Sequence, residues 1–141
     1  MQDSHNKIFI DSNVVIYAYS NSEKAKQQIA RRIIKESYTV ISTQVLQEMC
    51  NTLGRKFMLD YSSIKDALQE CIHSNNELYI NHQLTIFKAC DISKRYKLSF
   101  YDSLIISSAL ESKCNILYSE DLQYNQIIDG VLTIINPFIG H

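Results

Sequence analysis

The segment KIFIDSNVVIYAY, residues 7–19, passes from an apolar run into a helical pattern, with an acid near the junction. Residues 7–11 predict a short strand that ends at Asp11. Residues 14–19 predict one or two helical turns soon after it. A strand that leads so directly into a helix favours a fold in which strands and helices alternate.

The rest of the chain continues this alternation. Apolar residues at helical spacing predict helices, and short β-branched or aromatic runs predict strands. The expected helices cover 22–36, 43–57, a stretch that starts at Ser62 or Ser63, 82–97 and 102–113, and the expected strands cover 38–41, 77–80, 115–118 and 131–135. This order predicts an α/β fold with a mainly parallel central sheet flanked by helices. No repeat or linker interrupts it, so we expect residues 1–141 to form one domain.

The composition excludes several classes of protein. Hydrophobic residues make up 45% of the 141 residues, which is enough for a packed core and argues against disorder. No apolar run reaches the roughly 18 residues of a membrane-spanning helix. Residues 1–7 are too polar for a signal peptide, so we expect a cytoplasmic protein. The cysteines lack zinc-type spacing, and the histidines form no metal-ligand pattern.

Acidic residues follow two of the predicted strands. Asp11 ends the first strand, and Glu120 and Asp121 follow the strand at 115–118. In parallel sheets, ligands bind beyond the carboxyl ends of the strands. If these two strands are neighbours, the like charges lie close together, which is costly unless a cation neutralises them.

Two further acids lie on predicted helices. Asp102 opens the last predicted helix, and capping that helix is a sufficient reason for its presence. However, Asp102 shares a helix face with Ile105 and Ala109, which turns it toward the sheet. Glu48 borders an apolar stripe, and its ordinary interpretation is a solvent-facing glutamate. The net charge is only −1, yet with these five acids set aside the 14 lysines and arginines outnumber the remaining acids, which permits contact with phosphates.

Four segments together resemble the PIN-domain nucleases, and within them the VapC-like ribonuclease toxins of bacterial toxin–antitoxin pairs. They are FIDSNVVIYAY (9–19), STQVLQEMCNTL (42–53), LSFYDSLIISSAL (98–110) and LYSEDL (117–122), and they follow the family's order. No segment is decisive alone, but the four together are specific. The resemblance implies a PIN-like fold and a metal-dependent endoribonuclease that hydrolyses RNA phosphodiester bonds. It also implies a cognate antitoxin as partner, and a homodimer that binds the antitoxin along its helices.

The resemblance further implies roles for individual residues. The family's metal-binding and catalytic acids map onto Asp11, Glu48, Asp102 and Asp121. Asn13 matches an asparagine that braces the active-site turn, and Ser119 matches the Ser or Thr two residues before the last acid. Glu120 falls at a position that varies in the family, which makes it a supporting residue. Carboxylate oxygens select Mg²⁺ or Mn²⁺ over metals that prefer soft ligands.

Other functions stay open at this point. A phospho-receiver domain needs an Asp at the end of the third strand and a late Lys, whereas here the run 77–80 ends at Asn81 and no Lys follows Lys113. A dehalogenase-like phosphatase needs D-x-D where this chain has Asp11-Ser12-Asn13. A PIN nuclease of RNA processing, outside any toxin pair, and a non-catalytic RNA-binding or signalling module keep the same fold. The presence of all four acids argues against the latter, and the small size favours a toxin.

Overall fold

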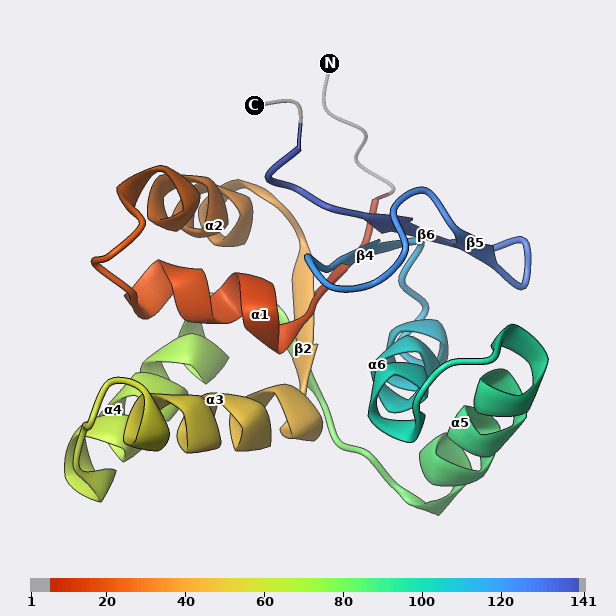
Figure 1. Cartoon of the computed structure of the whole chain (residues 1–141), viewed down its shortest axis with the longest axis horizontal. Helices are drawn as coiled ribbons and strands as arrows, with labels where there is room; N and C mark the ends of the chain where they lie inside the picture. The colour runs from red at the N-terminus through yellow and green to blue at the C-terminus, as the bar shows by residue number, and fades with distance from the viewer. Residues whose placement is uncertain (1–5, 140–141) are drawn as a thin grey trace.

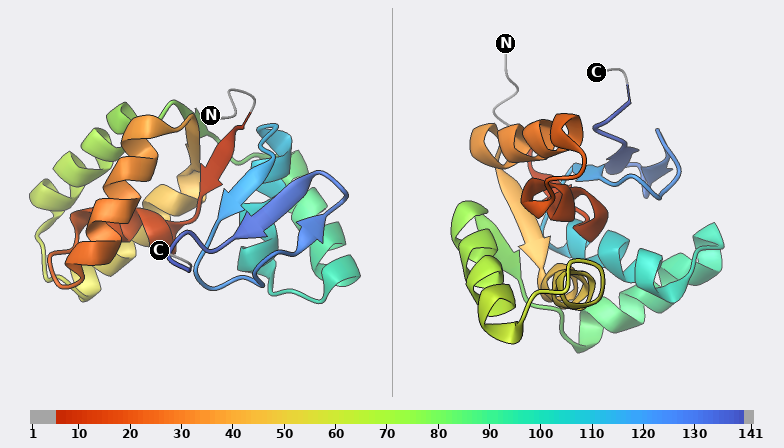
Figure 2. Two further views of the ribbon diagram at one scale, coloured as in Figure 1. Left: turned by 90° about the horizontal axis from the view of Figure 1, so that it is seen from above. Right: turned by 60° about the vertical axis from the view of Figure 1, so that its left-hand side comes forward.

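The computed structural model describes residues 6–139, so most of the polar stretch 1–7 and the last two residues lie outside the description (Figure 1). The helices are α1 (Ser12–Val15), α2 (Lys24–Glu36), α3 (Thr43–Arg55), α4 (Tyr61–Ser74), α5 (Gln83–Tyr96) and α6 (Phe100–Glu111), with a short 3-10 helix η1 (Ile16–Tyr19) after α1. The strands are β1 (Ile8–Ile10), β2 (Thr39–Ser42), β3 (Glu77–Tyr79), β4 (Ile116–Tyr118), β5 (Ile127–Ile128) and β6 (Leu132–Ile135). Helices α1 to α4 gather at one side of the sheet, and α5 and α6 lie together at the other (Figures 1 and 2).

The strands form one six-stranded sheet in the order β3-β2-β1-β4-β6-β5. β1 lies inside it, where Phe9 pairs in parallel with Val40 of β2 and Leu117 of β4. Within the described residues, only β5 runs antiparallel to its neighbour. The predicted α/β fold with a mainly parallel sheet is therefore confirmed.

This strand order creates a switch point. The chain leaves β1 toward β2 and β3 on one side, and returns later to place β4 on the other side. Between two such strands the connecting segments diverge, which opens a crevice at their carboxyl ends. The residues at those ends are Asp11 after β1 and Ser119 after β4.

The central strands are anchored by the core. All three residues of β1 are buried, and Phe9, Ile10 and Leu117 have no exposed surface. A strand that is apolar at every position is typical of a parallel sheet covered on both faces. This packing fixes the position of Asp11, because the residue that follows β1 cannot shift without moving buried side chains.

Several local predictions need correction. Asp102 does not cap a helix: Ser99 is the N-cap of α6 and its hydroxyl accepts the Asp102 N–H at 3.2 Å, so Asp102 lies in the first turn. Asp60, rather than Ser62 or Ser63, caps α4. The two-residue strand β5 was not predicted, since so short a run carries no periodicity. Within the described residues, no helix is long and apolar enough to cross a membrane.

Candidate active site

Asp11 is the centre of the candidate site. It is the N-cap of α1, and its Oδ1 accepts the backbone N–H of Ser12 at 2.7 Å. Its Oδ2 accepts the hydroxyl of Ser119 at 2.9 Å, from the end of the neighbouring strand β4. The residue is buried, with 6% of its surface exposed. The predicted strand-end acid is therefore held by both strands of the switch point.

Burial raises the pKa of Asp11 to about 7. The charges of Glu48 and Asp102 raise it further, while the hydrogen bonds from Ser119 and Ser12 act in the opposite direction. The upward shift means that the ionised carboxylate is poorly compensated by the protein alone. Such a group is a candidate for a bound cation or for acid–base chemistry.

Asn13 connects the loops that follow β1 and β4. Its amide Nδ2 donates to Asp121 Oδ2 at 3.0 Å, and it also lies 3.4 Å from Ser119 Oγ and 3.5 Å from Asp11 Oδ2. Its Oδ1 accepts the backbone N–H of Glu120 at 3.1 Å. One amide side chain thus ties the two predicted strand-end acids, Asp11 and Asp121, into a single group.

Glu120 is directed away from that group. One of its oxygens forms an ion pair with Lys26 of α2 at 2.6 Å, and the other accepts the Tyr17 hydroxyl at 2.8 Å. Lys26 also lies 5.3 Å from the centre of the Phe138 ring. The carboxylate of Glu120 is therefore already neutralised within the protein, which suits a supporting residue better than a metal ligand.

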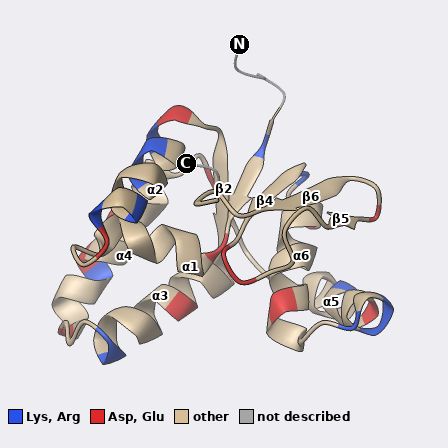
Figure 3. Cartoon of the chain, turned by 45° about the horizontal axis from the view of Figure 1, so that its top comes forward, with Lys and Arg blue, Asp and Glu red and all other residues tan. Residues whose placement is uncertain are grey.

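Glu48 and Asp102 approach the site from helices α3 and α6. Glu48 is half-buried rather than solvent-facing, and it accepts the Ser12 hydroxyl at 2.7 Å. The amide of Gln44 lies 3.3 Å from Glu48 and donates to the backbone oxygen of Tyr101 at 3.0 Å, so it links α3 to α6. The carboxylate of Asp102 has no hydrogen-bond partner among the described residues. Acidic segments of α3, of the start of α6 and of the loop after β4 lie around the middle of the molecule, whereas many basic positions lie on α2 and α5 (Figure 3).

The comparison with protein families decides the identity of this fold. The family model described as the PIN domain matches residues 8–129, which include every residue of the candidate site. The chain belongs to the PIN-domain family.

Solved structures agree on the fold. VapC20 of Mycobacterium tuberculosis, described as a toxin that cleaves the sarcin–ricin loop, superposes with a TM-score of 0.66 at 18% identity, over 81% of this chain and 89% of that one. A toxin–antitoxin complex from Klebsiella pneumoniae gives 0.67 at 14% identity, over 93% and 98%. VapBC2 from Rickettsia felis, bound to promoter DNA, gives 0.61 at 14% identity, over 92% and 99%. A search of curated proteins found no match. At these identities the likeness establishes the PIN fold and no more.

The donor chemistry of this PIN domain fits a hard divalent cation. Asp11 is a buried carboxylate with a raised pKa, and the charges of two further acids act on it. Oxygen donors of this kind suit Mg²⁺ or Mn²⁺. The residues are not a closed cage, however: within residues 6–139 no three acidic, histidine or cysteine side chains are grouped closely enough to hold a metal as they stand. Of these acids, Asp102 is the one whose carboxylate has no hydrogen-bond partner in the described part of the chain.

Sequence reasoning missed four residues of this PIN domain: Ser12, Gln44, Lys26 and Tyr17. Ser12 could have been found, because it lies between two candidate residues. Gln44 could have been found as the residue one helical turn before Glu48. Nothing in the sequence pointed to Lys26 or Tyr17, since each meets Glu120 from roughly 100 positions away in the chain.

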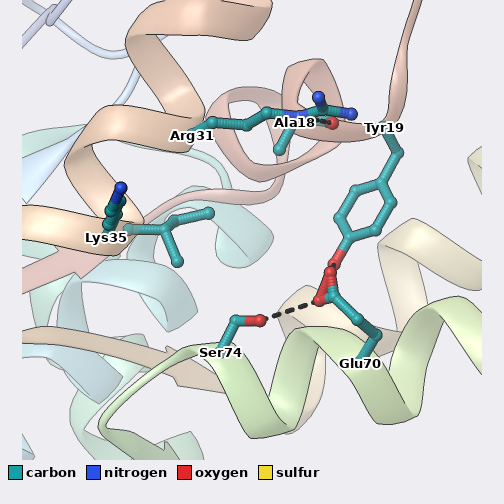
Figure 4. A pocket seen from close by; sticks show the side chains of 7 residues that line it. Ala18, Tyr19, Arg31, Lys35, Glu70 and Ser74 are labelled. Carbon is teal, nitrogen blue, oxygen red and sulfur yellow. Dashed lines mark hydrogen bonds between the residues drawn. The ribbon is translucent and has the colours of Figure 1, made fainter.

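A separate cavity lies between η1, α2 and α4, away from these acids (Figure 4). It measures about 420 Å³. The Tyr19 hydroxyl points into it and donates to Glu70, which also accepts the Ser74 hydroxyl at 2.8 Å. Arg31 and Lys35 of α2 lie across from this carboxylate, and Arg31 donates to the backbone oxygen of Ala18 at 2.9 Å. None of the predicted site residues lines this cavity.

Proposed function

We propose that this PIN domain is a metal-dependent endoribonuclease and the toxin of a toxin–antitoxin pair. The observation that carries the proposal is the buried Asp11 carboxylate, whose pKa is raised to about 7 at a switch point where other acids surround it. The named toxins with the same fold, one of them an RNA-cleaving protein, support the choice of RNA as substrate and of a toxin rather than a processing nuclease.

In this proposal Asp11, Glu48, Asp102 and Asp121 hold Mg²⁺ or Mn²⁺. When bound, the cation supplies charge to stabilise the scissile phosphate and lowers the pKa of a water molecule. The hydroxyl of Ser119 donates to Asp11 and the amide of Asn13 donates to Asp121, so these two side chains keep the carboxylate oxygens in place. Glu48 also lines the adjacent cavity, where its carboxylate would help to orient a water or accept its proton.

The test is RNA cleavage by the purified protein. A structured RNA is incubated with Mg²⁺, with Mn²⁺, and with excess EDTA, and the same series is run with Asp102→Asn as the control for a contaminating nuclease. We expect cleavage by the wild type with metal only. Equal cleavage with and without EDTA, or by both proteins, contradicts the proposal.

The partners are a second part of the proposal. An antitoxin protein is proposed as a partner because a toxin–antitoxin complex shares the fold. Assembly as a homodimer is proposed from the resemblance to VapC-like toxins alone. The antitoxin test is co-expression with the product of a short neighbouring reading frame, followed by purification and loss of RNA cleavage. Light scattering at micromolar concentration tests the dimer, and a monomer there contradicts it. We further propose that the protein acts in the cytoplasm.

A further inference from the structure

Three hollows beside the candidate site lie next to one another along α3, since all three are lined by Thr52. The first, of about 580 Å³, contains Glu48 and Thr52 and reaches Tyr101. The second, of about 370 Å³, shares Thr52 with the first and contains Asp121. The third, of about 390 Å³, also contains Thr52 and ends at Arg55. We call this row of adjacent hollows the α3 groove, and define it by Gln44, Gln47, Asn51, Arg55, Lys56 and Tyr101.

The two ends of the α3 groove differ in chemistry. At one end the Tyr101 ring is 65% exposed, and its only ring contact within the described residues is edge-on to Phe100, with centroids 5.3 Å apart. At the other end Arg55 and Lys56 are exposed and have no carboxylate partner in the described part of the chain. The distance along α3 from Gln44 to Arg55 is about 16 Å at 1.5 Å per residue.

Amide side chains lie between the ends. Gln47 and Asn51 are exposed, and Gln44 is buried with its Oε1 unpaired in the described structure. Amides are suited to the edges of unpaired bases, and a flat exposed aromatic ring is suited to their faces. Isolated cations on a helix end are suited to phosphate.

We propose that the α3 groove binds a single-stranded segment of RNA, with a base stacked on Tyr101 and a backbone phosphate held by Arg55 and Lys56. This inference rests on the proposed nuclease function. It places the scissile bond between the two ends, beside Glu48 and Asp121. Duplex RNA does not fit the arrangement, because its bases are already stacked and present no free face to Tyr101.

The experiment measures binding without cleavage. Fluorescence anisotropy is recorded in EDTA with a labelled single-stranded RNA of mixed sequence, using the Asp11→Asn protein as the common background. Asp11→Asn keeps the α1 cap and removes one charge that repels phosphate. Into it we introduce Tyr101→Ala, Tyr101→Phe, the pair Arg55→Ala with Lys56→Ala, and Lys94→Ala as an exposed cation of α5 away from the groove.

Substitutions at the two ends of the groove should alter RNA binding in different ways. Tyr101→Ala is expected to raise Kd about tenfold without altering its salt dependence, and Tyr101→Phe to bind as the background does, because stacking needs only the ring. The double variant at Arg55 and Lys56 is expected to reduce the magnitude of the slope of log K against log salt by about 0.7, since each phosphate contact on a single strand contributes about 0.7. Lys94→Ala should leave both quantities unchanged.

Three results overturn the inference: Tyr101→Ala that binds as the background does, an unchanged salt slope in the double variant, or equal affinity for a duplex of the same sequence. A short antitoxin peptide whose binding needs Tyr101, together with RNA binding that does not, would assign the groove to the protein partner instead. If the wild type cleaves RNA and the groove variants bind RNA as the background does, only this inference is contradicted. If the protein binds RNA as described but the wild type does not cleave it, only the nuclease proposal is contradicted.

Discussion

The two halves of the candidate site are built differently. On the strand side, Asp11, Asn13 and Ser119 share hydrogen bonds from both loops, and Asp11 is fixed behind a fully buried strand. On the helix side, Glu48 accepts two side-chain donors, and the Asp102 carboxylate accepts none within the described residues. The strand side is therefore set by the fold, whereas on the helix side the Asp102 carboxylate is free to adjust to a ligand. Substitutions in the two halves should separate stability from activity.

The largest expected effect is the loss of RNA cleavage when an acid from either half of the site is replaced. Asp11→Asn and Asp102→Asn should each lower RNA cleavage by orders of magnitude while the fold is retained. Asparagine caps α1 about as well as aspartate, and Asp102 is not a cap. Far-UV circular dichroism and a cleavage assay check the pair. Wild-type cleavage by Asp102→Asn would remove Asp102 from the site.

The loop after β4 provides the next contrast. Asp121→Asn should lower cleavage about tenfold or more, because Asp121 is proposed as a metal ligand held by Asn13. Glu120→Gln should have a smaller effect, because Glu120 faces Lys26 and Tyr17. Cleavage rates across a Mn²⁺ titration distinguish the two. A larger loss of cleavage in Glu120→Gln than in Asp121→Asn would place Glu120 among the metal ligands.

Stability without metal should depend on pH through Asp11. Its pKa in the folded state, about 7, is above the ordinary value of 3.8, so the folded state binds the proton more tightly than the unfolded state does. The contribution of this group is greatest below pH 4, declines as pH rises from about 4 to 7, and stays lost above that. The change is on the order of 1 kcal/mol or more, the scale of a shift of one pKa unit or more.

Thermal melts in EDTA from pH 4 to 8 measure this decline. The Asp11→Asn protein should show a flatter profile and be more stable than the wild type at pH 8. Saturating Mn²⁺ should flatten the wild-type profile at the upper end, because a bound cation favours the ionised carboxylate. Superimposable profiles for the two metal-free proteins would show that Asp11 titrates alike in folded and unfolded chains.

The smallest effect concerns the ion pair behind the strand side. Lys26→Met should lower stability by about 1 kcal/mol or less, as is typical of partly exposed pairs, and should change the Mn²⁺ affinity only a few-fold. Lys26 acts on the proposed metal ligands through Glu120. The backbone N–H of Glu120 donates to Asn13 Oδ1, and the amide of Asn13 holds Asp121. Lys26→Arg should restore both values. Calorimetric titration with Mn²⁺ checks this, and an unchanged affinity would confine Lys26 to a structural role.

The sequence predicted the strand side better than the helix side. Asp11 and Asp121 follow apolar strands, and parallel pairing alone brings such strand ends to one edge of the sheet. Asp102 was misplaced because Ser99 three residues earlier is the true cap, a Ser-x-x-Asp spacing that can be read in the sequence. The pairing of Lys26 with Glu120 could not be predicted, since it depends on how α2 packs over the loop after β4.

Asp11 both caps α1 and belongs to the candidate site, so the choice of substitution decides whether the chain loses its fold or only its proposed activity. One oxygen of the carboxylate starts α1, and the other faces the neighbouring strand. Alanine removes the helix cap together with the charge, whereas asparagine removes the charge and keeps the cap. Aspartate and asparagine codons differ by a single base. Under the proposed toxin function, cells that express this protein therefore have a one-step genetic route to a full-length and folded but inactive version, and we expect escape mutants to include the exchange at residue 11.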